Sequence, residues 1–167
     1  AAWRAGDAAT FDQQLKALPV WELGSRHSYL FYWDTGARVA AGLHIPIIRA
    51  WGYEPTAIAF VWVKLNKSRD AAFFYDFQTS FWMGGGYTTR KNVEYCVLAR
   101  RGHPPERKSK AIRELIFEPR REHSRKPEQA YRRIEQYADG PYLDLFAGAP
   151  RPGWQAWGDR LHLKVTA

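Results

Sequence analysis

Two segments of this sequence combine charge and predicted structure in a way that suits a cofactor with a ribose and an anionic group. The first is the basic stretch 120–127, RREHSRKP, which leads into a predicted helix. Helix N-termini attract anions through their free N–H groups. The second is the apolar run 142–147, YLDLFA, in which Asp144 lies near the end of a predicted strand. An acid at that place in a Rossmann-type strand can hydrogen-bond a ribose. Together they have the make-up of half a cofactor site.

Each of the two charged residues also has a simpler explanation. Lys126 directly precedes Pro127, so it either pairs with a cofactor carboxylate or is a solvated residue beside a helix cap. Asp144 either binds a ligand or has a structural partner, because a buried acid must be paired or hydrogen-bonded.

A glycine-rich segment, 81–94 (FWMGGGYTTRKNVE), could form a second part of a site. Glycines let the backbone approach a ligand closely. Trp82 and Tyr87 can stack on a base, and Asn92 or Glu94 can read a polar base edge. The alternative is a hairpin loop whose aromatic rings pack on the core. No Gly-Lys-Ser/Thr follows, so the segment is not a P-loop.

The sequence contains no motif that indicates metal binding or hydrolase catalysis. The five histidines show no metal-ligand spacing, and the sequence has no Gly-x-Ser-x-Gly elbow. The one cysteine, Cys96, lies in an apolar run and is expected in the core. We therefore expect no metal, no disulfide and a reducing, cytoplasmic setting, near the nucleoid if the source is bacterial or a phage.

Composition indicates one folded domain over residues 1–167. The chain is 46% hydrophobic and 16% aromatic, which argues against disorder. No signal peptide is visible, and no apolar run approaches the roughly 20 residues that span a bilayer. We expect no membrane association.

Positive charge is concentrated in one part of the chain. Of the net charge of +8, +7 falls in residues 100–133, which suits a polyanion such as nucleic acid. The alternative is a solvated surface that keeps an aromatic-rich domain soluble. If the loops leaving the predicted strands gather at one edge of the sheet, the basic loops border the same cleft. The substrate contacts expected there are Arg100, Arg101, Lys108 and Arg120, with Tyr87 and Asn92.

The pattern of apolar residues predicts an α/β protein. Helices are expected at 10–18, 37–51 (kinked or shortened by Pro46) and 127–137. Strands are expected at 29–33, 56–65, 92–99, 115–117, 142–147, 154–157 and 161–165. We expect a mostly parallel, twisted sheet with helices on both faces, in which 56–65 and 92–99 pair as an antiparallel hairpin at the edge.

Taken in order, several segments resemble the MT-A family, the N6-adenine methyltransferases related to the seventy-kilodalton subunit of the mRNA adenosine methyltransferase. The resemblance covers residues 10 to 163, and its glycine-rich and Arg-Pro-Gly-Trp segments look more like the bacterial and phage members. The matching segments are LPV (18–20), LFYW (30–33), AWGY (50–53), FVWVK (60–64), MGGGYTTRKNVE (83–94), HSRKP (123–127), LDLFA (143–147), RPGW (151–154) and WGD (157–159).

The resemblance implies a Rossmann-like methyltransferase fold, with S-adenosylmethionine as the donor and adenine in nucleic acid as the target, DNA being favoured over RNA. By position, Lys126 would hold the cofactor carboxylate and Asp144 its ribose region, with Ser124 and Phe146 beside them. Asp159 and Arg160 would lie near the cofactor adenine, where the family usually has Asn and a Gln or Glu. Glu94 falls where family members contact the target adenosine.

One family motif is not found in this sequence. The catalytic Asp-Pro-Pro-Trp does not occur, and Trp3 is the candidate for its last residue, with the prolines replaced. In the family the acid and the adjacent carbonyl accept hydrogen bonds from the target amino group, and the aromatic ring stacks on the flipped base. Two readings therefore stay open: an N6-adenine methyltransferase, or an inactive nucleic-acid-binding subunit that keeps the fold. Either reading allows a homodimer or a related partner subunit.

Overall fold

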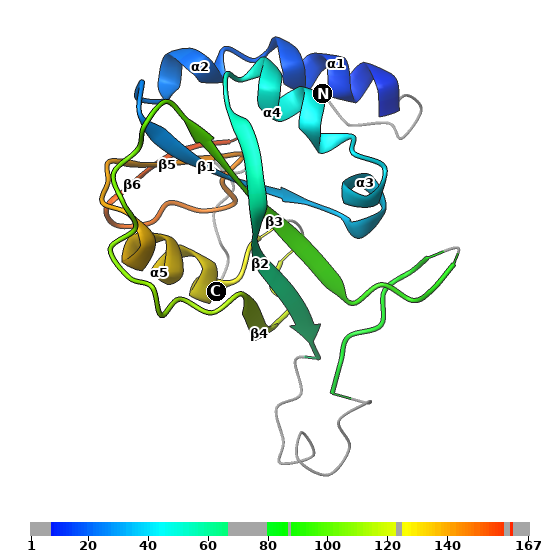
Figure 1. Cartoon of the computed structure of the whole chain (residues 1–167). Helices are drawn as coiled ribbons and strands as arrows, with labels where there is room; N and C mark the ends of the chain where they lie inside the picture. Colours follow the sequence, from blue (N-terminus) through cyan, green and yellow to red (C-terminus); the bar gives the residue numbers. More distant parts are fainter. Residues whose placement is uncertain (1–7, 67–79, 87, 123–124, 159–160, 162–167) are drawn as a thin grey trace.

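The computed structural model describes residues 8–66, 80–86, 88–122, 125–158 and 161, and it confirms the α/β class (Figure 1). None of the helices in these residues is long and apolar enough to cross a membrane. The helices are α1 (Ala8–Ala17), α2 (Val20–Leu23), α3 (Gly36–Ala40), α4 (His44–Ala50) and α5 (Glu128–Tyr137). The strands are β1 (Ser28–Asp34), β2 (Glu54–Leu65), β3 (Val93–Arg101), β4 (Leu115–Pro119), β5 (Tyr142–Leu145) and β6 (Trp154–Trp157).

The larger sheet has four strands in the order β1-β3-β2-β4. Strands β2 and β3 pair antiparallel, as expected. However, the expected position of this hairpin at the edge of the sheet is wrong, because β3 lies between β1 and β2. Since β3 also pairs antiparallel with β1 and only β2 and β4 pair parallel, the sheet is mixed rather than mostly parallel. Strands β1, β2 and β4 nevertheless run in one direction. Their C-terminal ends lie along one side of the sheet, which we call its carboxyl-end edge.

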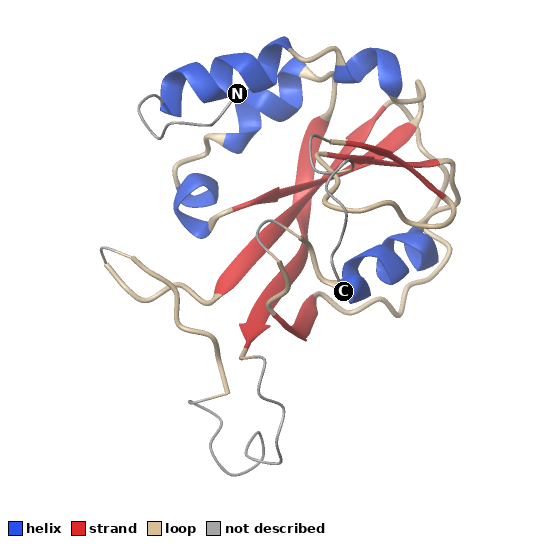
Figure 2. Cartoon of the chain, turned by 180° about the vertical axis from the view of Figure 1, so that it is seen from behind, coloured by secondary structure: helices blue, strands red, loops and turns tan. Residues whose placement is uncertain are grey.

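Two layers cover the two faces of this sheet (Figures 1 and 2). Because neighbouring residues of a strand point to opposite faces, Cys96 and Val97 of β3 belong to different cores. Val97 packs with α1 and α4 around Ile47 and Ile48. Cys96 packs with α5 around Phe60 and Ile116. The expected helices on both faces are therefore present.

Strands β5 and β6 form a separate, parallel pair on the side of the sheet where α5 packs. Tyr142 and Trp154 of this pair stack with ring centroids 4.7 Å apart, and both pack against the core that includes Cys96. The strand expected at 161–165 falls largely outside the described residues.

The helix expected over 37–51 is two helices, and the break is not at Pro46. Gly42 has a φ of +68°. Its N–H donates to the carbonyl of Val39, and the Leu43 N–H donates to that of Arg38. These two bonds form a Schellman motif, which ends α3 and requires the left-handed conformation that glycine adopts readily. Pro46 lies in the first turn of α4, where a helix tolerates proline.

Candidate functional site

The site lies at the edge where β1, β2 and β4 end and β3 begins. Glu94, the second residue of β3, is opposite Trp62 of β2, and Cys96 is opposite Trp33 of β1. The chain that follows β4 returns to this edge before α5 and brings Lys126 with it. Open α/β sheets bind ligands at the carboxyl ends of their strands, so this edge is the expected place for a site.

Glu94 bridges two lysines at this edge. The ammonium of Lys64 lies 2.8 Å from Oε2, and the ammonium of Lys126 donates a hydrogen bond to Oε1. The Glu94 side chain is 13% exposed. Burial, the largest single influence, would raise the pKa of Glu94, but the two lysines outweigh it and lower this pKa. Glu94 is therefore a charged hydrogen-bond acceptor at neutral pH.

Aromatic rings frame this ion-pair cluster. The Lys126 ammonium lies 5.6 Å from the ring centroid of Trp33. The Lys64 ammonium lies 4.9 Å from that of Trp62 and 5.7 Å from that of Trp82. The Arg120 guanidinium lies 4.8 Å from the ring centroid of the same Trp82. Such cation–π contacts hold long cationic side chains in place, so the cluster is an ordered alternation of cations and rings.

Asp144, in β5, occupies a second part of the edge. Its Oδ2 accepts a 2.8 Å hydrogen bond from the Tyr131 hydroxyl, and the Arg151 guanidinium lies 4.3 Å from the Tyr131 ring. Burial raises the pKa of Asp144, against the opposing effects of Tyr131, Arg151 and Lys126. A cavity of about 230 Å³ opens beside Asp144, with Arg121 among its lining residues.

Asp144, which is half-buried, accepts fewer hydrogen bonds than Asp34, the buried acid at the end of β1. Asp34 receives hydrogen bonds from the Thr35 N–H and the Arg38 guanidinium. Among the residues that the structure describes, Oδ1 of Asp144 accepts no hydrogen bond, and Oδ2 accepts only the one from Tyr131. A half-buried carboxylate with an oxygen left to accept, next to a cavity, suits a ligand that supplies hydroxyl donors.

The N-terminus of α5 is not vacant. The Glu118 carboxylate accepts the N–H groups of Glu128 at 2.7 Å and Gln129 at 3.0 Å. The expectation of an anion site formed by this helix N-terminus is therefore wrong, because an acid of the chain itself fills it. The bonds from Glu118 also fix the start of α5, one residue after Pro127, and so hold the chain that carries Lys126.

These segments decide the family. A model of the MT-A70 family matches residues 4–160, nearly the whole chain. The chain belongs to the MT-A70 family. It is 26% identical to the type II methyltransferase M.MunI of a Mycoplasma species over 148 residues, which are 87% of this chain and 56% of that protein. It is 28% identical to the human N(6)-adenosine-methyltransferase catalytic subunit METTL3 over 137 residues, 80% of this chain and 22% of METTL3.

A third relative extends this comparison to plants. A putative N(6)-adenosine-methyltransferase MT-A70-like protein of Medicago truncatula is 26% identical over 153 residues, which are 90% of this chain and 23% of that protein. The chain thus spans about half the length of the first curated relative it matches and about a quarter of the others.

Some of the residues predicted for an MT-A70 site come together in the structure. Glu94 and Lys126, which are 32 positions apart in the sequence, are in direct contact. Asn92 lies beside them, since its carbonyl accepts the Lys64 N–H at 2.8 Å. Arg120 follows β4 at the same edge, where its N–H donates to the carbonyl of Leu65.

Phe146 also lies near Asp144, directly after β5. It has a φ of +64°, unusual for a residue other than glycine. Its ring is half exposed and lies edge-on to Trp157, 5.5 Å away. Strained, exposed aromatic residues occur at ligand sites, and the prediction that Phe146 contacts the cofactor stays a prediction. The other predicted residues lie outside the described part of the chain: Trp3, Tyr87, Ser124, Asp159 and Arg160.

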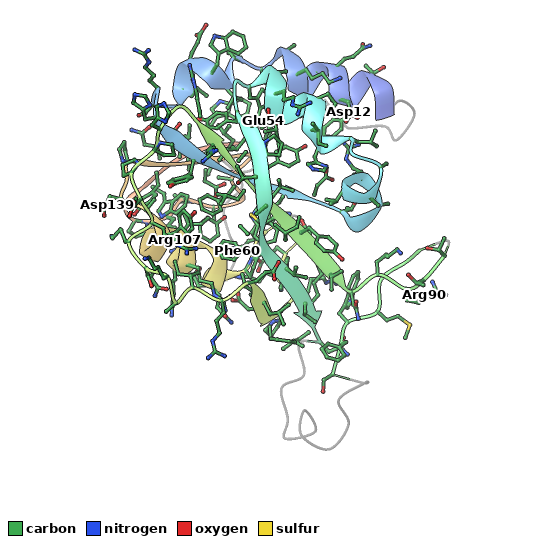
Figure 3. All side chains as sticks on the ribbon, viewed as in Figure 1. Asp12, Glu54, Phe60, Arg90, Arg107 and Asp139 are labelled. Carbon is green, nitrogen blue, oxygen red and sulfur yellow. The ribbon has the colours of Figure 1, made fainter. Side chains whose placement is uncertain are left out.

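Three predicted substrate contacts are not at this edge. Arg100 and Arg101 end β3, and at about 3.4 Å per residue Arg101 lies about 24 Å along the strand from Glu94. Lys108 pairs with Asp139, 2.6 Å away. Figure 3 shows Arg107 and Asp139 beside α5, far from the hairpin that carries Arg90. The expectation that both basic loops border one cleft is wrong, because β3 runs against its neighbours and ends at the opposite edge.

Sequence reasoning gave no role to Lys64, Tyr131 or Arg151. A signal for Lys64 was available, because Phe60, Trp62 and Lys64 alternate along β2 and therefore share the face that holds Glu94. The contacts of Tyr131 and Arg151 depend on how α5 packs on β5, which no local pattern reveals. Cys96 is fully buried, as expected, and burial raises the pKa of its thiol. It is therefore a core residue and no nucleophile.

Proposed function

We propose that this MT-A70 domain binds S-adenosylmethionine and an adenine of nucleic acid, and that it acts in N6-adenine methylation, on DNA rather than RNA. The observation that carries the proposal is the contact between Glu94 and Lys126, whose chain neighbour Arg125 lines the cavity at Asp144. The resemblance assigns Glu94 to the target and Lys126 to the cofactor, and the fold brings them together from distant parts of the sequence. M.MunI and METTL3 carry methyltransferase names, which supports the reaction class.

The described residues fit the proposed cofactor. The Lys126 ammonium has three N–H donors, one of which contacts Glu94, and it can turn from Glu94 to a cofactor carboxylate. Asp144 has a vacant acceptor, which matches a ribose hydroxyl. The cavity, about 230 Å³, is smaller than the usual range of about 300–1,000 Å³ for ligand pockets, so it would hold only the ribose end. Asp159 and Arg160 remain proposed for the adenine end.

S-Adenosylmethionine, when bound, supplies an electrophilic methyl group on a sulfonium. The protein's contribution is to position the amino group of the target adenine in line with that methyl group. Glu94 would accept a hydrogen bond from this amino group, because its two lysines keep it charged. Trp82, which contacts Lys64 and Arg120, carries a ring against which an extruded base would stack.

The same edge supports the finer fold assignment. Strands β1, β2 and β4 share a direction and carry the candidate site at their C-terminal ends, as in Rossmann-like folds. We include in the proposal a Rossmann-like methyltransferase sheet and a second copy or related subunit that completes the site. A cytoplasmic location, close to the nucleoid in a bacterial or phage source, is part of the same proposal.

The path proposed for the nucleic acid is a groove between β4 and α5. The groove has a volume of about 500 Å³, and Arg120, Arg121 and Arg132 line it. Arg120 and Arg132 are exposed, and Arg120 also contacts Trp82. Glu118, which lines the groove too, is taken up by the N–H groups of α5. The phosphates that flank the target base would therefore follow these arginines. Arg100, Arg101 and Lys108 would contact only a longer strand that reaches the far edge.

A second function stays in view: an inactive nucleic-acid-binding subunit. The arginine groove favours it as much as it favours an enzyme, because phosphate binding needs no chemistry. A methyl-transfer assay separates the two. The protein expressed from the complete reading frame that encodes this chain would be incubated with S-adenosylmethionine, radiolabelled in its methyl group, and with adenine-containing DNA or RNA. We expect labelled N6-methyladenine in DNA. Cofactor binding without any transfer to either substrate would leave the inactive subunit as the function.

A further inference from the structure

We propose that Lys64 is a positioning residue that holds Glu94 toward the target adenine while Lys126 is engaged by an anionic ligand. The proposal rests on the proposed function and deepens it, because the resemblance and the sequence assigned no role to Lys64. It follows from the contact of the Glu94 carboxylate with both Lys64 and Lys126, of which only Lys126 is proposed to bind the cofactor.

Lys64 is held in position near the end of β2. It is one residue from the end of β2, on the same face as Trp62 and Glu94. Its backbone is fixed on both sides, since its N–H donates to the Asn92 carbonyl and its carbonyl accepts the Trp82 N–H. Its side chain is 18% exposed and lies across two tryptophan rings. Lys64 is therefore held in place without Lys126.

Lys64 contacts Oε2 of Glu94 and Lys126 contacts Oε1, so each cation has its own oxygen. An anionic ligand at Lys126 would draw that ammonium away from Oε1 and leave this oxygen vacant. Lys64 would keep the other oxygen in place. The vacant oxygen could then accept a hydrogen bond from the target amino group.

Among the described residues, the charged groups that face Glu94 are Lys64 from β2 and Lys126 from the chain before α5; the neighbouring Cys96 thiol on β3 is neutral. Burial alone would raise the pKa of Glu94. If Lys126 turned to a ligand and Lys64 were absent, Glu94 would be a buried acid without a cation, and it would take up a proton and stop accepting. The arrangement predicts that Lys64 becomes more important when the ligand is bound.

The test follows Glu94 itself. The carboxyl carbon of Glu94, labelled with ¹³C-glutamate and assigned by its loss in Glu94→Gln, would be titrated by NMR with and without S-adenosylhomocysteine. Lys64→Met should raise the titration midpoint by about one pH unit or more, and the ligand should raise it further. Lys64→Arg should restore most of the wild-type value. Lys91→Met is the matched control, because it removes a lysine whose ammonium contacts Thr88 and Thr89 instead of Glu94. It should leave the midpoint unchanged.

A ligand effect on Glu94 would not follow from a merely structural ion pair. An unchanged Glu94 midpoint in folded Lys64→Met, or an equal shift in Lys91→Met, would overturn the proposal. If Lys64→Met does not fold, Lys64→Gln serves in its place, with the same expected shift and the same refuting results. Failure of the proposed function has a different signature: no ligand binding to the wild type, with the Lys64-dependent shift still present in the free protein.

Discussion

The hydrogen bond from Tyr131 to Asp144 gives the sharpest prediction on stability. Burial raises the pKa of Asp144 above its ordinary value of 3.8 in the folded protein. Ionisation of Asp144 therefore costs stability, and this cost grows as the pH rises from 3.8 through the folded-state pKa. The Tyr131 hydroxyl offsets part of the cost, because it donates at 2.8 Å and burial raises its own pKa, so that it stays protonated.

Tyr131→Phe removes this donor and leaves the ring. Hydrogen bonds to charged groups contribute about 1.5–3 kcal/mol. Because Asp144 is partly accessible to water, we expect a loss of about 2 kcal/mol at pH 7.5, which lowers Tm by about 4–8 °C for a domain of this size. At pH 5, where more of Asp144 is protonated, the loss should be smaller. The assay is urea unfolding at both pH values.

Two comparisons make this result interpretable. Tyr29→Phe also removes a tyrosine hydroxyl, but one that donates to the neutral carbonyl of Pro105. Its loss should be below about 1 kcal/mol and the same at both pH values. In the Asp144→Asn background, Tyr131→Phe should cost less than in the wild type, since the charged acceptor is absent. Equal losses for Tyr131→Phe at pH 7.5 and pH 5, or in both backgrounds, would refute the reasoning.

Three further predictions concern other parts of the molecule. Because the lysines lower the pKa of Glu94 below 4.5, its contribution to stability is present above that pH and is lost as the pH falls through the folded-state pKa. Glu94→Gln should therefore cost about 2 kcal/mol in urea unfolding at pH 7 and progressively less as the pH falls below 4.5 through the folded-state pKa; a loss independent of pH would contradict this. Gly42→Ala should cost about 1 kcal/mol because of its φ of +68°, whereas Gly85→Ala, with open space around it, should be neutral; equal effects would show that conformation is not the cause. Arg120→Ala/Arg132→Ala should reduce by about 1.4 the slope of the logarithm of the single-stranded DNA binding constant against the logarithm of salt concentration. The far-edge variant Arg107→Ala/Lys110→Ala, with the same charge change, should leave this slope unchanged. The reverse pattern would place the nucleic-acid path at the far edge.

The sequence was sufficient for most of the elements and for the antiparallel pairing of β2 and β3, but insufficient for the order of the strands. The apolar runs located the strands around Phe31, Trp62 and Cys96, because burial selects such residues locally. The place of β3 inside the sheet depends on contacts between distant segments, so periodicity did not reveal it. The break between α3 and α4 was attributed to Pro46, but the conformation of Gly42 decides it.

In the candidate site, too, the sequence identified residues but not the contacts between them. The residue types of Glu94, Lys126 and Asp144 pointed to a binding role, and the resemblance placed them in one site. That Glu94 and Lys126 contact each other, and that Lys64 shares the carboxylate, required the tertiary structure. The error over Arg100 and Arg101 came from a single assumption, that every strand ends at the same edge. One reversed strand was enough to move both arginines to the far edge.

The most direct test of the account is a calorimetric titration of the protein with S-adenosylmethionine and its demethylated product. We expect both to bind the wild type. Lys126→Ala should weaken binding by about 1.5–3 kcal/mol, roughly 10- to 150-fold, through the lost charged hydrogen bond, and Lys91→Ala should leave it unchanged. The absence of heat and of any thermal shift at millimolar ligand, or equal affinities of the wild type and Lys126→Ala, would contradict the proposed cofactor site.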